Sequence, residues 1–305
     1  MWISETMLQQ TRVEAVIPYY KRFLARFPSV EALAGAEESD VLALWSGLGY
    51  YSRARNLHKA AKQVAAEGVP ASCEGLRKLP GVGPYTAAAV ASIALGLPHA
   101  AVDGNVLRVV SRLLADGGEI AAPVTRRRFA EAADQLLDRR RPGDFNQAMM
   151  ELGATVCVPG KPVCGACPVA KFCAARAAGT ERELPVKRRA AETRGVALEL
   201  VVLERAGSIL LIQRGASERR MAGFWELPEK HLVPEVRGRA KAAFTHAIVN
   251  DRFRVNVWRC KTERAPEGRW IPITELGGMP VSTITRKALQ AMGLAPVIPS
   301  PSAEI

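Results

Sequence analysis

The sequence lacks any apolar run that approaches the ~18 residues of a membrane-spanning helix. It also lacks the apolar N-terminal segment of a secretory signal peptide, because Glu5, Gln9 and Arg12 stand there instead. No internal repeat is visible. These absences exclude a helical membrane protein and a repeat array, and they predict a soluble protein of the cytoplasm.

Acidic residues are in deficit. The chain has 42 Lys and Arg against 30 Asp and Glu, which gives a formal net charge of +12. Such an excess favours a polyanionic partner, and nucleic acid is the first choice. Cysteine is scarce as well, since there are six in 305 residues and four of them lie in one short segment. That clustering favours a bound metal in a reducing compartment over a disulfide framework.

The length and the 48% hydrophobic content are enough for two domains. Residues 1–178 show no strand alternation, so we expect a helical domain there. Residues 179–195 are charged and poor in apolar side chains, as a linker is. Residues 196–294 turn to strand patterns, and residues 295–305 are expected to be a disordered tail.

Glycine and proline breaks separate the expected helices of the first domain. They span residues 2–26, 40–45, 52–66, 73–79, 84–95, 106–114, 125–137 and 144–156. The second domain is expected to alternate strands and turns. Its expected elements are hairpin strands at 196–203 and 209–213 around Ala206-Gly207-Ser208, a strand through Phe253, Val255 and Val257, and a helix at 283–292 capped by Ser282.

Residues 79–95 have the pattern of a helix–hairpin–helix. Gly81-Val82-Gly83 provides a turn in which both glycines can take positive φ, and Pro84 suits the first position of the next helix. Backbone N–H groups at such a turn can hold a phosphate without recognising sequence. The second helix leads to Asp103. On the residues alone, Asp103 is either the N-cap of the next helix or a functional carboxylate.

Four cysteines form the most specific pattern in the chain. Cys157, Cys164, Cys167 and Cys173 are separated by six, two and five residues. Four thiolates on one short loop, residues 157–173, suit a [4Fe–4S] cluster, and a structural zinc ion accepts the same ligands. The spacing by itself leaves both metals open.

Several of these motifs resemble those of one family. LPGVG at 79–83 followed by VDGNV at 102–106 resembles the helix–hairpin–helix DNA glycosylase superfamily, and SETMLQQT at 4–11 resembles its adenine-specific MutY branch. The cysteine spacing is similar to that of endonuclease III and MutY proteins, which implies a [4Fe–4S] cluster. The resemblance implies an all-α helix–hairpin–helix glycosylase domain with an iron–sulfur cluster loop, followed by a C-terminal α+β Nudix-like domain.

The resemblance also implies roles for Glu5 and Asp103. Two carboxyl groups that flank a glycosidic bond are the standard apparatus of its cleavage. Glu5, which alone would pass for a helix-surface acid, would protonate adenine at N7 and later activate water. Asp103 would stay ionised and oppose the developing charge on the sugar, with or without a covalent bond to C1′. Asn105 would orient Asp103.

Tyr85 stands where bifunctional endonuclease III-like enzymes carry a lysine. A phenol cannot form the Schiff base that leads to strand cleavage, so the resemblance implies a monofunctional glycosylase. It also places Tyr85 in the catalytic pocket and Glu151 near the bound adenine. On the residues alone, Tyr85 is an exposed aromatic at a helix start and Glu151 is a capping or ion-pairing acid.

A base flipped from a duplex leaves a gap that side chains fill. By resemblance, Gln10, Leu48 and Tyr50 fill it, the last two as an apolar wedge and an aromatic ring in a glycine-rich loop. Gly81-Val82-Gly83 would contact the phosphate backbone. Arg53 and the basic residues after it fit further phosphate contacts, although a solvated helix face would have the same composition.

In the C-terminal region, Phe244-Thr245-His246 matches the trio with which the family recognises 8-oxoguanine from a strand loop. An active Nudix hydrolase needs carboxylates to hold its metal ions, but Gly238, Lys241 and Ala242 stand at the matching positions. A recognition role is therefore expected for this domain, rather than pyrophosphate hydrolysis.

Family members carry further residues before the position of Trp2, so a late start codon, a fragment or a real loss is expected. Together with its residues, the resemblance implies a monomeric, nucleoid-associated adenine DNA glycosylase of base excision repair that acts on double-stranded DNA with A:8-oxoguanine or A:G mispairs. One alternative is a bifunctional endonuclease III-like glycosylase/lyase, which Tyr85 disfavours. The other is a non-catalytic lesion-binding protein, which the presence of Glu5 and Asp103 disfavours.

Overall fold

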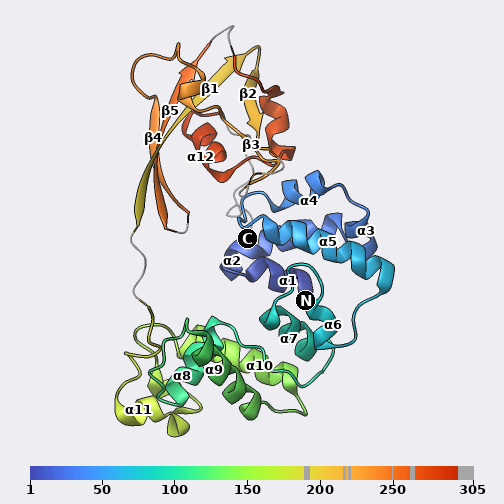
Figure 1. The fold of residues 1–305 in the computed structure, drawn as a ribbon, viewed down its shortest axis with the longest axis vertical. Helices are drawn as coiled ribbons and strands as arrows, with labels where there is room; N and C mark the ends of the chain where they lie inside the picture. The colour runs from blue at the N-terminus through green and yellow to red at the C-terminus, as the bar shows by residue number, and fades with distance from the viewer. Residues whose placement is uncertain (189–192, 216–217, 219–220, 249, 262–264, 295–305) are drawn as a thin grey trace. The chain divides into compact units, whose positions relative to one another are not determined.

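A computed structural model describes residues 1–188, 193–215, 218, 221–248, 250–261 and 265–294 of the chain (Figure 1). The chain forms two compact units, one of residues 1–6 with 63–190 and one of residues 7–62 with 191–305. The boundaries expected from the sequence divide the chain differently and stay a prediction. The expected tail and residues 189–192 of the expected linker lie outside the described residues.

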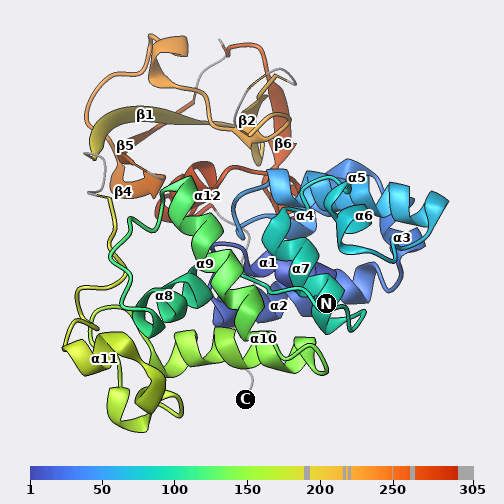
Figure 2. The same ribbon diagram turned by 60° about the horizontal axis from the view of Figure 1, so that its bottom comes forward.

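The first unit is helical and also contains the start of α1 (Trp2–Leu8). Its other elements are α6 (Cys73–Arg77), α7 (Pro84–Ile93), α8 (Gly104–Leu113), α9 (Pro123–Leu136), α10 (Pro142–Glu151), the π-helical turn η1 (Leu152–Val156), the 3₁₀ turns η2 (Cys164–Ala166) and η3 (Ala170–Phe172), and α11 (Ala174–Ala178). Helix α10 packs against both α7 and α8, and the three can be followed in Figure 2. The expected helices of this unit are confirmed within a few residues, whereas α11 was not expected.

Helix α7 forms where small apolar residues follow a glycine turn. Gly83 is its N-cap, Pro84 takes its first position, and the residues from Thr86 to Ser92 are buried. Gly81 adopts φ +75°, which glycine accepts without strain. The expectation that both glycines take positive φ is wrong for Gly83, whose φ of −82° is extended because it already leads into the helix.

The N-terminal helices of the second unit are α2 (Val13–Arg26), α3 (Val30–Ala34), α4 (Glu38–Trp45) and α5 (Ser52–Glu67). A single helix over residues 2–26 was expected, and this is wrong. Gln10 takes the left-handed conformation with φ +57°, which ends α1, and the Thr11 amide turns back to the Leu8 carbonyl at 3.1 Å. Helix α3, which Ser29 caps, was not expected.

A mixed sheet makes up the C-terminal part of this unit. Its strands are β1 (Arg194–Arg205), β2 (Ser208–Gln213), β3 (Trp225–Glu226), β4 (Ala242–Ile248), β5 (Asp251–Cys260) and β6 (Arg269–Pro272), accompanied by η4 (Lys230–Leu232), η5 (Ile273–Gly278) and α12 (Thr283–Ala291). The order is β3-β2-β1-β5-β4, and β6 pairs with β2. Strands β1 and β5 are parallel and the other pairs are antiparallel, so the expected α+β class is confirmed.

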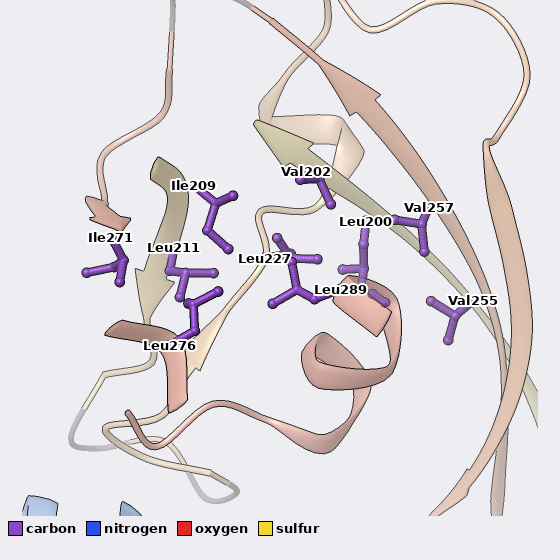
Figure 3. Close-up of a cluster of buried hydrophobic side chains, with 11 residues drawn as sticks. Leu200, Val202, Ile209, Leu211, Leu227, Val255, Val257, Ile271, Leu276 and Leu289 are labelled. Atoms are coloured by element: carbon purple, nitrogen blue, oxygen red, sulfur yellow. The ribbon is translucent and has the colours of Figure 1, made fainter. Parts of the chain in front are cut away.

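Local chemistry explains the sheet's hairpin and its helix. Ala206 and Gly207 form the two-residue turn of the expected β1–β2 hairpin, with φ of +47° and +75° as a type I′ turn requires. Ser282 Oγ caps α12 by accepting the Thr285 amide, as expected. Figure 3 shows the apolar cluster between sheet and helix, in which Leu200 of β1 and Leu289 of α12 are both buried. Among the described helices, none combines the length and apolarity needed to span a bilayer.

Candidate active site

Glu5 and Tyr85 meet in the first unit although they lie on different helices. The Tyr85 hydroxyl is 2.7 Å from Glu5 Oε2 and 3.3 Å from the sulfur of Met150 on α10. Burial raises the pKa of Tyr85 far above its usual value, and the hydrogen bond to Glu5 and the charges of Glu5 and Asp103 raise it further. The phenol therefore stays protonated and serves as a donor to the carboxylate.

Each oxygen of the Asp103 carboxyl group has its own hydrogen-bond partner. Its Oδ1 accepts the Val106 amide at 2.7 Å, so the N-cap interpretation of the sequence is confirmed. Its Oδ2 accepts a hydrogen bond of 2.9 Å from Asn105 Nδ2, as expected for a residue that orients the carboxylate. Two donors, one on each carboxylate oxygen, fix the direction of the Asp103 side chain.

Arg108 contacts Asn105 on the side away from Asp103. No role for Arg108 was expected from the sequence. Its Nη2 donates to Asn105 Oδ1 at 2.9 Å and to the Gly153 carbonyl at 2.7 Å, while Nε donates to the Cys157 carbonyl at 2.8 Å. Because a guanidinium can only donate, Asn105 Oδ1 must face it, which leaves Nδ2 for Asp103. The sequence feature that could have indicated Arg108 is a basic residue one helical turn after Asn105 in an otherwise apolar stretch.

Gly153 allows η1 to pack closely against Asn105 of α8. A Cβ built on Gly153 would lie 2.6 Å from Asn105 Cβ, so only glycine allows η1 to come so close to α8. Glu151, the last residue of α10, is exposed, and its neighbour Met150 contacts Tyr85. The structure therefore brings together Glu5 with Tyr85 and Asp103 with Asn105. Glu151 belongs to neither pair and only follows Met150, which contacts Tyr85.

The four clustered cysteines line one pocket together with Arg112. Arg112 is 2% exposed, and its Nη1 donates to the sulfur of Cys157 at 3.2 Å and to the carbonyls of Cys157 and Val158 at 3.1 and 2.9 Å. Within the described residues, no three His, Cys, Asp or Glu side chains gather as ligands of a single metal ion. The cysteines surround the pocket instead of meeting at one point.

The residues expected to fill the gap in DNA lie in two turns of the second unit. Gln10 is exposed and Tyr50 is 49% exposed, and both have positive φ, of 57° and 49°. Leu48 was expected to project as an apolar wedge, but it is only 7% exposed because its side chain packs inward. Arg53 was expected either to contact phosphate or to lie on a solvated helix face, and both expectations are wrong. Its side chain is 8% exposed and its guanidinium binds backbone carbonyls.

Phe244-Thr245-His246 lies inside β4, at the edge of the sheet, and not in a loop. The strand continues through the trio because Phe244 packs against the apolar core while Thr245 faces solvent. Thr245 and His246 line a surface pocket with Asp251 and Arg252. His246 Nδ1 is 3.2 Å from Lys287 Nζ, and burial together with that ammonium lowers the pKa of His246.

The helix–hairpin–helix turn has the expected local form. Val82 is 7% exposed and its amide donates to the Leu79 carbonyl at 3.1 Å, which anchors the turn between α6 and α7. Gly81 and Gly83 flank this anchor without side chains. The turn therefore presents backbone at the N-terminus of α7, where a helix dipole favours an anion.

Comparison with known proteins agrees with this arrangement. Residues 3–135 match the family of HhH-GPD superfamily base excision DNA repair proteins. An adenine DNA glycosylase of Arabidopsis thaliana is 38% identical over 292 residues, which cover 84% of this chain and 46% of that relative. One from Rattus norvegicus is 50% identical over 179 residues, which cover 57% of this chain and 35% of that relative. Residues 3–135 thus form an HhH-GPD domain, and the chain is similar in sequence to adenine DNA glycosylases.

The chain spans less than half the length of either relative. A thermostable thymine-DNA glycosylase is similar to it in structure, with a TM-score of 0.53 and 29% identity over 58% of this chain and 83% of that one. The expected helical glycosylase fold is thereby confirmed. A MutT Nudix hydrolase from Burkholderia pseudomallei is also among its structural neighbours, covering 32% of this chain and 98% of that one, with 19% identity and a TM-score of 0.28.

Proposed function

We propose that this chain is a monofunctional adenine DNA glycosylase that hydrolyses the N-glycosidic bond of adenine mispaired with 8-oxoguanine or guanine. The observation that carries the proposal is that Glu5 and Asp103 have different hydrogen-bond partners, while the charges of both act on Tyr85. Glu5 accepts a hydrogen bond from the half-buried Tyr85 hydroxyl, and Asp103 accepts hydrogen bonds from Asn105 and from the Val106 amide. Two carboxyl groups in different surroundings can divide acid and base work between them.

In the proposed reaction, protonated Glu5 gives its proton to N7 of adenine. The bond between N9 and C1′ then breaks, and its electron pair leaves with adenine. Ionised Asp103, held by Asn105, opposes the positive charge that develops on the sugar. Water adds to C1′ and returns a proton to Glu5, so the products are free adenine and an abasic sugar. Glu151 would contribute to the adenine pocket from the end of α10.

Tyr85 supports the monofunctional assignment. A lysine amine at this place would attack C1′ and form a Schiff base, whereas a half-buried phenol whose pKa is raised has neither the amine nor the charge for that step. Its hydrogen bond to Glu5 gives it a different task, which is to hold the acid in place.

The proposed substrate is double-stranded DNA, which the net charge of +12 favours. The backbone of Gly81-Val82-Gly83 would hold a phosphate, and the exposed Gln10 and Tyr50 would occupy the space of the flipped adenine. Phe244-Thr245-His246, with its pocket at the sheet edge, would recognise 8-oxoguanine in the opposite strand. Such a substrate would place the protein at the nucleoid, and a monomer is sufficient for the reaction.

A [4Fe–4S] cluster fits the cysteine pocket better than a single zinc ion. Zinc needs four sulfurs about 2.3 Å from one point, whereas the thiolates of a cluster bind different irons and stand apart around a larger body. Cys157, Cys164, Cys167 and Cys173 line a pocket without converging, which supports the cluster. When bound, it would supply a rigid scaffold for the loop. Iron and sulfide analysis of anaerobically purified protein, with a Cys167→Ser variant as control, tests this assignment.

The reaction is tested by single-turnover adenine release from a duplex that contains A opposite 8-oxoguanine. Alkali is added to half of each sample to cleave abasic sites. The proposal expects strand breaks only after alkali. Breaks without alkali, together with a borohydride-trapped protein–DNA adduct, would show a bifunctional enzyme instead. Tight binding without release would show a lesion-binding protein.

A further inference from the structure

Arg53 connects two turns that are far apart in sequence. From the first turn of α5 its Nη1 donates to the Met7 carbonyl at 2.9 Å and also to the Gln9 carbonyl. Its Nη2 donates to the Gly49 carbonyl at 3.1 Å and to Thr11 Oγ1 at 3.3 Å. One guanidinium therefore binds both the junction of α1 and α2 and the turn that precedes α5.

The two turns share a strained conformation at their centres. Gln10 and Tyr50 are not glycines, yet their φ angles are +57° and +49°. This backbone conformation is strained for a residue with a side chain and persists only where the surroundings hold it. The groups that bind Arg53 flank these residues directly, with Gln9 and Thr11 on either side of Gln10 and Gly49 just before Tyr50.

The surroundings of Arg53 suit a permanent clamp rather than a contact with solvent or phosphate. The side chain is 8% exposed, and its guanidinium carbon lies 5.6 Å from the Trp45 ring centre and 5.3 Å from that of Tyr50. Burial lowers the pKa of Arg53 to about 10, so it still carries its charge at neutral pH. Charge-assisted hydrogen bonds to carbonyls then offset the cost of burial.

We propose that Arg53 is a positioning residue that holds Gln10 and Tyr50 in left-handed conformations, so that both side chains stay ready to occupy the space of the flipped nucleotide. The inference rests on the proposed function for the task of these side chains, but the clamp itself rests on the geometry alone. Only a planar fork of donors can bind both turns at once, because a lysine ammonium is a single point.

Arg55 provides a matched control in the same helix. Its Nε pairs with Glu38 at 2.8 Å and its Nη2 donates to the Ala222 carbonyl, so it binds neither turn. Arg53→Lys and Arg55→Lys make the same chemical change, and only the first removes a guanidinium that donates to both the Gln9 and the Gly49 carbonyl. Thr11→Val offers a milder variant, which deletes one partner of Arg53 and keeps the guanidinium.

Hydrogen exchange of the full chain tests the clamp without DNA. The Thr11 amide donates to Leu8 and the Leu48 amide to Trp45, so the two amides report the opening of the two turns. We expect Arg53→Lys to speed exchange in both turns by about 10-fold, and Thr11→Val to speed it in the first turn alone. Unchanged protection in Arg53→Lys would overturn the proposal, as would equal loosening in Arg55→Lys. If Arg53→Lys loses its fold by circular dichroism, Thr11→Val decides.

Base flipping then tests the consequence. With 2-aminopurine as the target base, we expect the fluorescence rise on binding to fall about 10-fold in Arg53→Lys and to be kept in Arg55→Lys. The defect should shrink on a duplex that has an abasic site opposite the target, because less pairing must be broken. Loosened turns with normal flipping would overturn the task assigned to them. Absence of adenine release in the unaltered chain would defeat the proposed function, while exchange would still decide the clamp.

Discussion

The Tyr85 hydroxyl lies 2.7 Å from Glu5 Oε2, although 80 positions separate the two residues in the chain. The contact joins the second helical position of α7 to the middle of α1. It assigns Tyr85 a direct effect on the proposed general acid, since a donor on one carboxylate oxygen fixes which oxygen faces the substrate.

Replacing Tyr85 by Phe removes this donor and keeps the ring. Loss of this one hydrogen bond, which orients Glu5, corresponds to about a 10-fold fall in the single-turnover rate of adenine release. Tyr20→Phe on α2 makes the same chemical change elsewhere and should leave the rate as it was. A Tyr85→Phe enzyme as fast as the unaltered chain would remove Tyr85 from the mechanism.

Asp103 can be tested with two substitutions that separate its cap from its charge. Asn caps helices about as well as Asp, so Asp103→Asn should keep the urea midpoint and DNA binding while adenine release falls to background. Asp103→Ala should lose release and also about 1 kcal/mol of unfolding free energy. Adenine release at a normal rate by Asp103→Asn would contradict the assignment of Asp103.

Gly153→Ala should act on the site through Asn105. The new Cβ would lie 2.6 Å from Asn105 Cβ and 3.1 Å from its carbonyl oxygen, so α8 or η1 must move. We expect a loss of about 1–3 kcal/mol in urea unfolding, together with slower adenine release. Gly117→Ala, where a Cβ meets nothing within 4 Å, is the matched control. If both substitutions change the unfolding free energy and the rate of adenine release equally little, η1 and α8 do not pack tightly at Gly153.

His246 should titrate according to its contact with Lys287. Burial and the Lys287 ammonium lower its pKa, so the pKa of His246 in the folded state lies below the unfolded value of about 6.5. The folded state therefore favours the neutral ring of His246. Its contribution to stability is therefore present above that pH and is lost as pH falls through the folded-state pKa. Asp251 and Arg252 of β5 share its pocket and complete the charges around it.

In an NMR titration, Lys287→Met should raise the pKa of His246 toward its ordinary value, because a positive neighbour has been removed. Lys241→Met, which removes a lysine just before β4, serves as control. An unchanged His246 titration in Lys287→Met would show that the contact does not persist in solution. The Lys287 variant should also discriminate less well between 8-oxoguanine:A and G:A duplexes, if Lys287 holds the ring for recognition.

Sequence patterns succeeded where short-range chemistry decides the backbone. Ser282 caps α12, Ala206-Gly207 turns the β1–β2 hairpin, and Asp103 caps α8, all as expected. Each involves a side chain or turn within about four residues of its partner, so propensity and capping suffice to predict it. Patterns failed where one residue overrode a local preference, as Gln10 does when it divides the expected helix 2–26.

What the sequence alone determined is therefore the identity of the elements and the candidates for chemistry: a glycine turn before α7, four cysteines on one loop, and carboxylates at Glu5 and Asp103. What only the tertiary structure decided is which groups meet. Arg108 faces Asn105 and the Cys157 carbonyl, and Arg53 faces inward against two turns, because the packing of distant helices buries them. The residue type of an arginine does not show whether its side chain lies on a solvated helix face or is buried against backbone carbonyls. Only the fold supplies the carbonyls that make burial of its charge favourable.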